Sequence, residues 1–248
     1  MDLVIDIGNS RTKMALFLGS RMVRSDVSAT GDVAAITAFI GDDRIARSAM
    51  GSVANEDPVL IDHLRSIAPL LIITGSTPTP LRLNYTLPAT LGADRLANAV
   101  GAANFFPGRA VLAIDLGTCV TYDVVDASGV YHGGIISPGL RMRAKAMHAY
   151  SARLPEVDPP ENTTLIGTST EESLASGAHH GVRAELRTLI EEIGQQHADL
   201  AVVLTGGDAP RFARALENGI FAHPFLTLFG LHAILEHITS AGDTAIAG

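Results

Sequence analysis

Two turns with the same residue pattern are the strongest chemical feature of the sequence. Asp6-Ile7-Gly8-Asn9 and Asp115-Leu116-Gly117-Thr118 each end a short apolar run. A glycine directly after a strand lets the backbone approach a phosphate, and N–H groups of the turn then point at its oxygens. The aspartate cannot bind phosphate, but it can hold a cation that does. A single copy would be an ordinary hairpin turn, whereas the pair predicts two phosphate-binding turns.

Two further features fit phosphoryl transfer. Lys13 lies four residues after Asn9 and could place its charge on a γ-phosphate. The run Thr205-Gly206-Gly207-Asp208 puts a glycine pair between an apolar segment and a helical one. Such a pair can admit a phosphate or an adenosine against the backbone, although a strand-to-helix turn also uses glycine for steric reasons.

A third motif, Gly92-Ala93-Asp94-Arg95, opens an Ala-rich segment that should be a helix. Asp94 could accept the proton of an attacking hydroxyl, and Arg95 could bind a carboxylate or a phosphate bidentately. Phosphoryl transfer needs little more than such a base and a cationic clamp. The alternative is a helix cap beside a surface ion pair.

The composition limits the partners and the compartment. The 248 residues carry a net charge of −8 without any Lys/Arg-rich run, which argues against nucleic acid or an anionic membrane surface as partner. The longest apolar runs are too short to span a membrane, and Asp2 stands where a secretory signal would carry a base. With Cys119 as the single cysteine, no internal disulfide can form, and a reducing cytoplasm is the expected location.

The elements that must position these motifs form an internal repeat. Leu3–Ile7 and Thr12–Leu18 have the pattern of a β-hairpin, and Ala110–Leu116 followed by Val120–Val125 repeats it. Each half of the chain therefore begins with a strand, an Asp-x-Gly turn and a second strand. Strands alternate with helical segments in both halves, which predicts an α/β protein of mixed sheets flanked by helices.

The repeat also predicts the domain organisation. Pro107-Gly108 breaks the chain, so we expect an N-terminal domain over residues 1–109 and a similar C-terminal domain over residues 110–248. A last helix, about residues 226–239, could pack back on the first domain.

With these residues in place, a resemblance to a known group becomes visible. The Asp-x-Gly turns and the late Thr-Gly-Gly loop resemble the superfamily of acetate and sugar kinases, heat-shock chaperone ATPases and actin. Within it, nearly the whole chain resembles type III pantothenate kinase, because Tyr85 is followed seven residues later by Gly92-Ala93-Asp94-Arg95. The resemblance implies two similar actin-like (ribonuclease H-like) domains. It also implies transfer of the ATP γ-phosphoryl group to the pantothenate hydroxyl, the first step of coenzyme A biosynthesis.

The resemblance implies a role for individual residues. ATP and its phosphates would be bound by Asp6, Ile7, Gly8, Asn9, Ser10, Arg11, Thr12, Lys13, Thr118, Gly206 and Gly207. Pantothenate would be bound by Tyr85, Gly92, Ala93, Asp94, Arg95 and Thr170, with Asp94 as the proton acceptor. Asp115 would hold a monovalent cation, K⁺ or NH₄⁺, and Asp6 is the candidate for Mg²⁺.

The family is a homodimer, so the resemblance also implies that Thr170 contacts substrate across the dimer interface. That family usually has Asn where Ser169 stands.

Two alternatives remain open. Another small hydroxy-acid or sugar kinase of the superfamily would share both turns but not the spacing from Tyr85 to Asp94-Arg95. A non-catalytic regulatory accessory factor could keep the fold and lose the base, whereas this chain has Asp94, Lys13 and Asp115.

Overall fold

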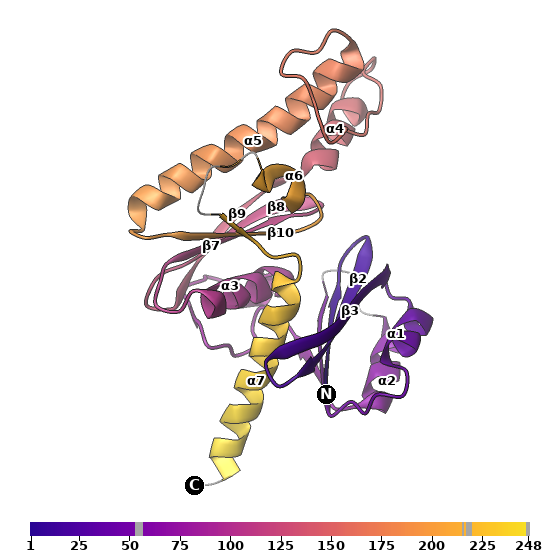
Figure 1. Ribbon diagram of the computed structural model, residues 1–248, viewed down its shortest axis with the longest axis vertical. Coiled ribbons are helices and arrows are strands. Elements are labelled where there is room, and N and C mark those ends of the chain that lie inside the picture. The colour runs from indigo at the N-terminus through magenta and orange to yellow at the C-terminus, as the bar shows by residue number, and fades with distance from the viewer. Residues whose placement is uncertain (53–56, 215, 217–219, 247–248) are drawn as a thin grey trace. The chain divides into compact units, whose positions relative to one another are not determined.

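The computed structural model describes residues 1–52, 57–214, 216 and 220–246. It contains two mixed β-sheets flanked by helices (Figure 1), which confirms the predicted α/β class. Contacts between residues group the chain into two compact units. The first comprises Met1–Pro107, Gly129–His132 and Phe225–Gly248, and the second Gly108–Ser128 and Gly133–Pro224. The domain boundary expected at residues 109 and 110 stays a prediction.

The sheet of the first unit has the order β3-β2-β1-β4-β5. Its strands are β1 (Asp2–Ile7), β2 (Arg11–Leu18), β3 (Arg21–Ala29), β4 (Arg47–Ser52) and β5 (Leu70–Ile73). β1 pairs antiparallel with β2 and parallel with β4, so the predicted N-terminal hairpin is confirmed. β3 was not predicted, because this edge strand is largely exposed and shows no apolar alternation.

Alternation along β1 divides the two faces of this sheet. Leu3, Ile5 and Ile7 are buried in a core that includes residues of α1 (Val33–Ile40) and α2 (Pro58–Ile67). Both helices begin at an aspartate whose side chain accepts a backbone N–H hydrogen bond, Asp32 for α1 and Asp57 for α2. The intervening residues Asp2, Val4 and Asp6 point to the opposite face.

That opposite face is covered by α3 (Ala93–Phe105) and α7 (Leu226–Ile246). The two helices approach each other to backbone contact, because a Cβ at Gly230 would lie 1.7 Å from the Ala97 carbonyl oxygen and one at Gly101 would lie 2.8 Å from the Leu226 oxygen. Beside this contact the buried Thr227 hydroxyl donates to Asn98 Oδ1 over 2.8 Å. Glycine at both positions is therefore a packing requirement.

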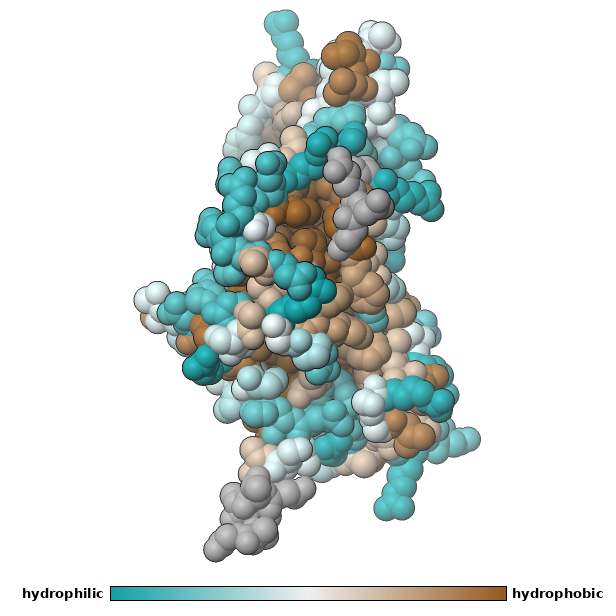
Figure 2. Space-filling view, turned by 60° about the vertical axis from the view of Figure 1, so that its left-hand side comes forward, coloured by the Kyte–Doolittle hydropathy of each residue, from teal (hydrophilic) through white to brown (hydrophobic). Residues whose placement is uncertain are grey.

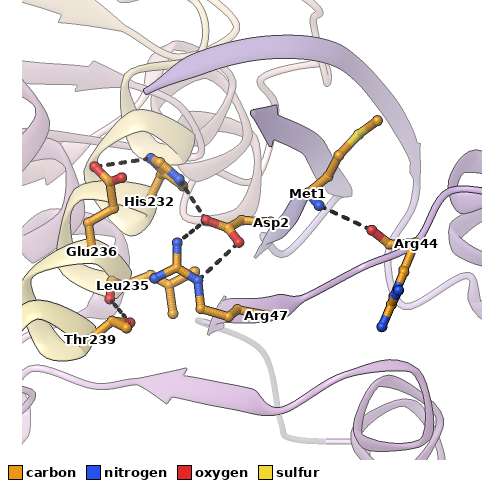
Figure 3. A network of polar contacts seen from close by, with 8 residues as sticks. All are labelled: Met1, Asp2, Arg44, Arg47, His232, Leu235, Glu236 and Thr239. Carbon is orange, nitrogen blue, oxygen red and sulfur yellow. Dashed lines mark hydrogen bonds and ion pairs between the residues drawn. The ribbon is translucent and has the colours of Figure 1, made fainter. Parts of the chain in front are cut away.

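A polar network ties α7 to the first strand (Figure 3). Asp2 accepts a 3.0 Å hydrogen bond from Arg47 Nε and lies 3.2 Å from His232 Nε2. Burial raises the pKa of Asp2, but its hydrogen bonds and charge interaction with Arg47 outweigh burial and hold that pKa below its ordinary value. The His232 ring also stacks on Phe17 with centroids 4.1 Å apart. α7 is thus fixed to β1 as well as to α3.

The second unit contains the repeated hairpin. Its sheet has the order β11-β10-β7-β8-β9, and β6 (Arg82–Leu83) pairs in parallel with the first residues of β9. The strands are β7 (Val111–Leu116), β8 (Cys119–Val125), β9 (Val130–Pro138), β10 (Ala201–Thr205) and β11 (Ile220–Ala222). The antiparallel pairing of β7 with β8 confirms the second predicted hairpin.

Helices cover one face of this sheet. They are α4 (Leu140–Ala149), α5 (Thr170–Gln196) and α6 (Ala209–Ala213). The first unit also contains a short 3₁₀ helix, η1 (Pro88–Thr90). Ile114, Tyr122 and Leu204 point into a core shared with Val182 and Leu186 of α5. Among the described residues, no helix is both long and apolar enough to cross a membrane.

Candidate active site

The first Asp-x-Gly turn connects β1 to β2 and is braced from the end of β3. The Gly8 N–H donates to the Arg11 carbonyl oxygen over 3.0 Å, which closes the turn. Thr30 donates its hydroxyl to the Gly8 carbonyl oxygen, and the Gly31 N–H donates to the buried Thr12 hydroxyl. Thr12 therefore holds the turn in shape.

The residues at the tip of this turn, Asn9, Ser10 and Arg11, are exposed, and Gly8 is half-buried. A Cβ at Gly8 would lie 3.2 Å from the Arg11 carbonyl oxygen, so the turn leaves little room for a side chain there.

Strand register places three predicted features in one row across the first sheet. Lys13 of β2 pairs with Asp6 of β1, which pairs in turn with Gly51 of β4. Directly paired residues project from the same face, so the Lys13 and Asp6 side chains are neighbours. Ile7 pairs with Thr12 in the next row and points to the opposite face.

Gly51 lets α3 approach this row. A Cβ at Gly51 would lie 2.9 Å from a methyl carbon of Leu231 and 3.6 Å from the Ala93 Cβ. Ala93 is the first residue of α3 and is buried. The first turn of α3, which contains Asp94, therefore begins beside the strand position next to Asp6. The structure thus brings the base candidate to the row of Asp6 and Lys13.

Asp94 folds back toward the start of its own helix. Its Oδ1 accepts a 2.8 Å hydrogen bond from the Arg95 N–H, and a Cβ at Gly92 would lie only 2.4 Å from that oxygen. Burial raises the pKa of the Asp94 carboxyl above its ordinary value, because desolvation outweighs its hydrogen bonds and the Arg95 charge. Gly92 is the N-cap residue and makes no side-chain cap. The segment thus gives a carboxylate of increased basicity.

The other predicted substrate residues flank this helix start. Arg95 is 6% exposed, so its long side chain lies mostly within the first unit. The half-buried Tyr85 packs at a tilt against Tyr131, with ring centroids 5.9 Å apart. The Tyr85 segment is fixed by the adjacent Asn84 N–H, which donates to the Tyr131 carbonyl oxygen over 2.9 Å.

The second Asp-x-Gly turn carries a different row. Asp115 of β7 pairs with Thr121 of β8 and with Thr205 of β10. The Oγ1 atoms of Thr121 and Thr205 are buried, and within the described part of the chain they have no hydrogen-bond partner. Oxygen atoms that need a partner therefore stand on both neighbouring strands. Sequence reasoning gave these two threonines no role, although Thr121 follows Asp115 at nearly the spacing at which Lys13 follows Asp6.

Two glycine loops pack directly on this turn. A Cβ at Gly206 would lie 2.4 Å from Asp115 Oδ1, and Gly206 has a φ of +93°. A Cβ at Gly139 would lie 2.4 Å from the Gly117 carbonyl oxygen, and the Gly139 N–H donates to the Thr118 carbonyl oxygen over 3.1 Å. Thr118 itself is exposed. Gly206, Gly207 and Thr118 thus belong to one assembly of loops.

Thr170 does not join that assembly. It is the exposed first residue of α5, with Ser169 as N-cap accepting from the Glu172 N–H over 3.1 Å. Arg143 of α4 approaches Gly181 of α5, since a Cβ there would lie 3.5 Å from an Arg143 nitrogen. With a rise of about 1.5 Å per residue, Thr170 lies roughly 16 Å farther along α5 than Gly181.

Comparisons with known proteins identify the family. The type III pantothenate kinase family model matches residues 2–192. The chain is 40% identical to the type III pantothenate kinase of Porphyromonas gingivalis, over 95% of this chain and 98% of that protein. It is 37% identical to the type III pantothenate kinase of Bacteroides fragilis, over 96% of this chain and 98% of that one.

Solved structures of more distant proteins share the fold. The activator of the 2-hydroxyisocaproyl-CoA dehydratase from Clostridium difficile superposes with a TM-score of 0.55 at 15% identity, covering 98% of this chain and 97% of that one. A ROK family glucokinase from Streptomyces griseus gives a TM-score of 0.54 at 14% identity, covering 95% and 98%. These likenesses establish the actin-like fold that the family resemblance implied. The agreement over nearly the full length shows that the chain belongs to the type III pantothenate kinase family.

Proposed function

We propose that this chain transfers the γ-phosphoryl group of ATP to the primary hydroxyl of pantothenate, the first step of coenzyme A synthesis. The observation that carries the proposal is the row of Lys13, Asp6 and Gly51 with the first turn of α3 packed on it. It combines a cation for the phosphates, a carboxylate for a hydrated metal ion and the base Asp94. The 40% identity with a type III pantothenate kinase supports pantothenate as the acceptor.

Asp94 takes the proton of the attacking hydroxyl. Burial raises the pKa of Asp94, which increases its affinity for that proton. Gly92 lacks the Cβ that would clash with Oδ1, so the carboxylate keeps its place at the helix start. Arg95 binds the carboxylate of pantothenate, and Tyr85 forms a wall beside it.

The tip of the first turn binds phosphate. The Gly8 N–H is engaged by Arg11, so the exposed Asn9 and Ser10 offer their N–H groups to the phosphate oxygens. Lys13 adds a point charge from the neighbouring strand. Asp6 would hold Mg²⁺ on the phosphate side, and a metal ion there would supply positive charge to the transferred phosphoryl group.

The second turn fits a monovalent cation. Alkali cations prefer oxygen ligands, and the buried hydroxyls of Thr121 and Thr205 flank the Asp115 carboxylate in one row. We therefore assign K⁺ or NH₄⁺ to this row, with Thr118, Gly206 and Gly207 contacting ATP beside it. A cation held there would offset the charge of Asp115.

A homodimer explains the position of Thr170. This residue lies far along α5 from the glycine loops, so it would contact substrate in a partner subunit. Leu165 and Ile166, just before it, are 69% and 78% exposed. Figure 2 shows hydrophobic surface at the top of the view, at the end where Figure 1 draws α4 and the start of α5. We place the dimer interface there, and the enzyme in the cytoplasm.

An acceptor screen tests the proposal. Purified protein with ATP, Mg²⁺ and K⁺ is incubated with pantothenate, with other hydroxy acids and with sugars, and ADP release is followed. We expect turnover with pantothenate alone. Turnover with another acceptor would reassign the substrate, and failure with every acceptor despite nucleotide binding would favour an accessory factor.

A further inference from the structure

One carboxylate in the second unit receives hydrogen bonds from three different elements. Glu185 Oε1 of α5 accepts from the Tyr122 hydroxyl of β8 over 2.8 Å and from the Ser137 hydroxyl of β9 over 2.6 Å. Its other oxygen, Oε2, forms an ion pair with Arg143 of α4. The Glu185 and Arg143 side chains are only 24% and 22% exposed. This half-buried position strengthens the pair relative to an ion pair on the surface.

The groups held by Glu185 are next to the second Asp-x-Gly turn in the chain. Tyr122 follows the turn on β8, whereas Ser137 precedes Gly139, whose N–H donates to Thr118. Arg143 reinforces the second connection, because its Nε donates to the Pro138 carbonyl oxygen over 2.8 Å and its Nη2 to the Ser137 hydroxyl over 3.0 Å. The network therefore fixes the strand that leaves the turn and the loop that packs on it.

The electrostatics keep this network in one protonation state. Although burial raises the pKa of Glu185, hydrogen bonds from Ser137, Arg143 and Tyr122 outweigh burial and hold that pKa below its ordinary value. Burial and the neighbouring Glu185 charge raise the pKa of Tyr122, so its hydroxyl stays a donor. The carboxylate accepts and its partners donate across the neutral range.

We propose that Glu185 and Arg143 are positioning residues for the nucleotide, which set the place of Gly117 and Thr118 through the Ser137–Gly139 segment. The inference rests on the proposed assignment of ATP to the second turn. Neither side chain touches the nucleotide. Loss of either side chain lets the loop at Gly139 shift. Because the Gly139 backbone packs against the Gly117 and Thr118 carbonyl oxygens, the second Asp-x-Gly turn shifts with that loop.

Calorimetric titration with Mg²⁺ and the non-hydrolysable analogue ADPNP tests this proposal without any acceptor. Glu185→Gln keeps the side-chain shape and removes the charge, and we expect its Kd for ADPNP to rise about tenfold. Arg143→Met should raise the Kd for ADPNP by a similar factor. The double variant should bind ADPNP no more weakly than either single variant, because each substitution breaks the same Glu185–Arg143 ion pair. The KM for pantothenate should stay within about twofold of the wild type. Tyr85 and Asp94 belong to the other unit, and Thr170 lies about 22 Å along α5 from Glu185.

Arg141→Met is the matched control. Arg141 lies on the same helix and pairs with Asp158 over 2.9 Å, but both side chains are mostly exposed. Its ADPNP affinity should equal that of the wild type. If Glu185→Gln does not fold, Tyr122→Phe removes a single hydrogen bond and should weaken ADPNP about threefold.

Wild-type ADPNP affinity in the variants, with a lower unfolding temperature, would overturn the proposal and leave a purely structural network. The proposed function could fail separately, because a chain that phosphorylates another acceptor would still show the loss of nucleotide affinity.

Discussion

The two Asp-x-Gly turns share a backbone plan and differ in how the aspartate charge is balanced. In the first, Asp6 stands opposite Lys13, so the protein itself supplies a cation. In the second, Asp115 stands between Thr121 and Thr205, which supply neutral oxygens. The first aspartate thus faces a charged side chain, whereas the second faces neutral hydroxyls, and we propose that an ion from solution binds at the second turn.

The helices beside the turns differ in the same way. α3 and α4 both begin after a glycine N-cap that makes no side-chain hydrogen bond, Gly92 and Gly139. The second residue of α3 is the carboxylate Asp94, whereas α4 has Arg141 at that position. Of these two helices, only α3 thus has a carboxylate at its second residue, and we propose that carboxylate as the proton acceptor.

Removing the base should have the largest effect. Asp94→Asn keeps the shape of the helix start but cannot accept a proton, so kcat should fall by about 10²–10⁴-fold in a steady-state ADP-release assay. Asp62→Asn, an exposed carboxylate of α2, is the control and should keep the wild-type rate. A near-normal rate for Asp94→Asn would show that Asp94 only caps α3.

Changing the charge of the first turn should have the next largest effect. Lys13→Thr replaces the cation opposite Asp6 with a neutral hydroxyl, as Thr121 provides opposite Asp115. The KM for ATP should rise about 10–100-fold, because a charge-assisted contact is lost. The KM for pantothenate, measured at saturating ATP, should change little. A change confined to pantothenate would place Lys13 on the acceptor instead.

The glycine pair tests how tightly the second turn is packed. Gly206→Ala puts a Cβ 2.4 Å from Asp115 Oδ1 at a φ of +93°, and it should lower the free energy of unfolding by about 1–3 kcal/mol. A Cβ at Gly207 would meet nothing within 4 Å, so Gly207→Ala should leave the unfolding temperature unchanged. If thermal unfolding showed equal destabilisation by both substitutions, Gly206 would not be packed more tightly than Gly207.

The smallest predicted effect concerns stability and pH. Because the folded state raises the pKa of Asp94, its charge disfavours folding above the unfolded pKa, and stability falls as pH rises through the folded pKa. Asp94→Asn removes that cost, so the ligand-free variant should unfold at a higher temperature than the wild type at pH 7. The gain should vanish below a pH of about 4. A lower unfolding temperature at pH 7 would instead make Asp94 a stabilising residue.

Local pattern was sufficient to predict the two hairpins. Apolar strands that end in Asp-x-Gly are visible in any short window of the sequence. β3 was missed because its exposed edge position removes the apolar alternation on which a strand prediction depends. The last helix continues to Ile246, beyond the expected end near residue 239.

Contacts between distant parts of the chain could not be predicted from the sequence, because they depend on strand register and helix packing. Thr205 joins Asp115 only because β10 pairs with β7, and Glu185 meets Arg143 across 42 positions of chain. Nothing in the sequence around Gly51 indicates that α3 packs against it. The hairpins were therefore predictable from local pattern, whereas these long-range neighbours could be found only in the fold.

The most direct test of the different charge balance at the two Asp-x-Gly turns is the yield of phosphopantothenate in K⁺ and in Na⁺. Mass spectrometry quantifies this product against ADP. The wild type should form the two products in equal amounts in K⁺ and lose activity in Na⁺. Thr121→Lys, which gives Asp115 a cation of its own, should reduce the ratio of the two rates to within about threefold. ADP without phosphopantothenate, or equal wild-type rates in both salts, would contradict the account.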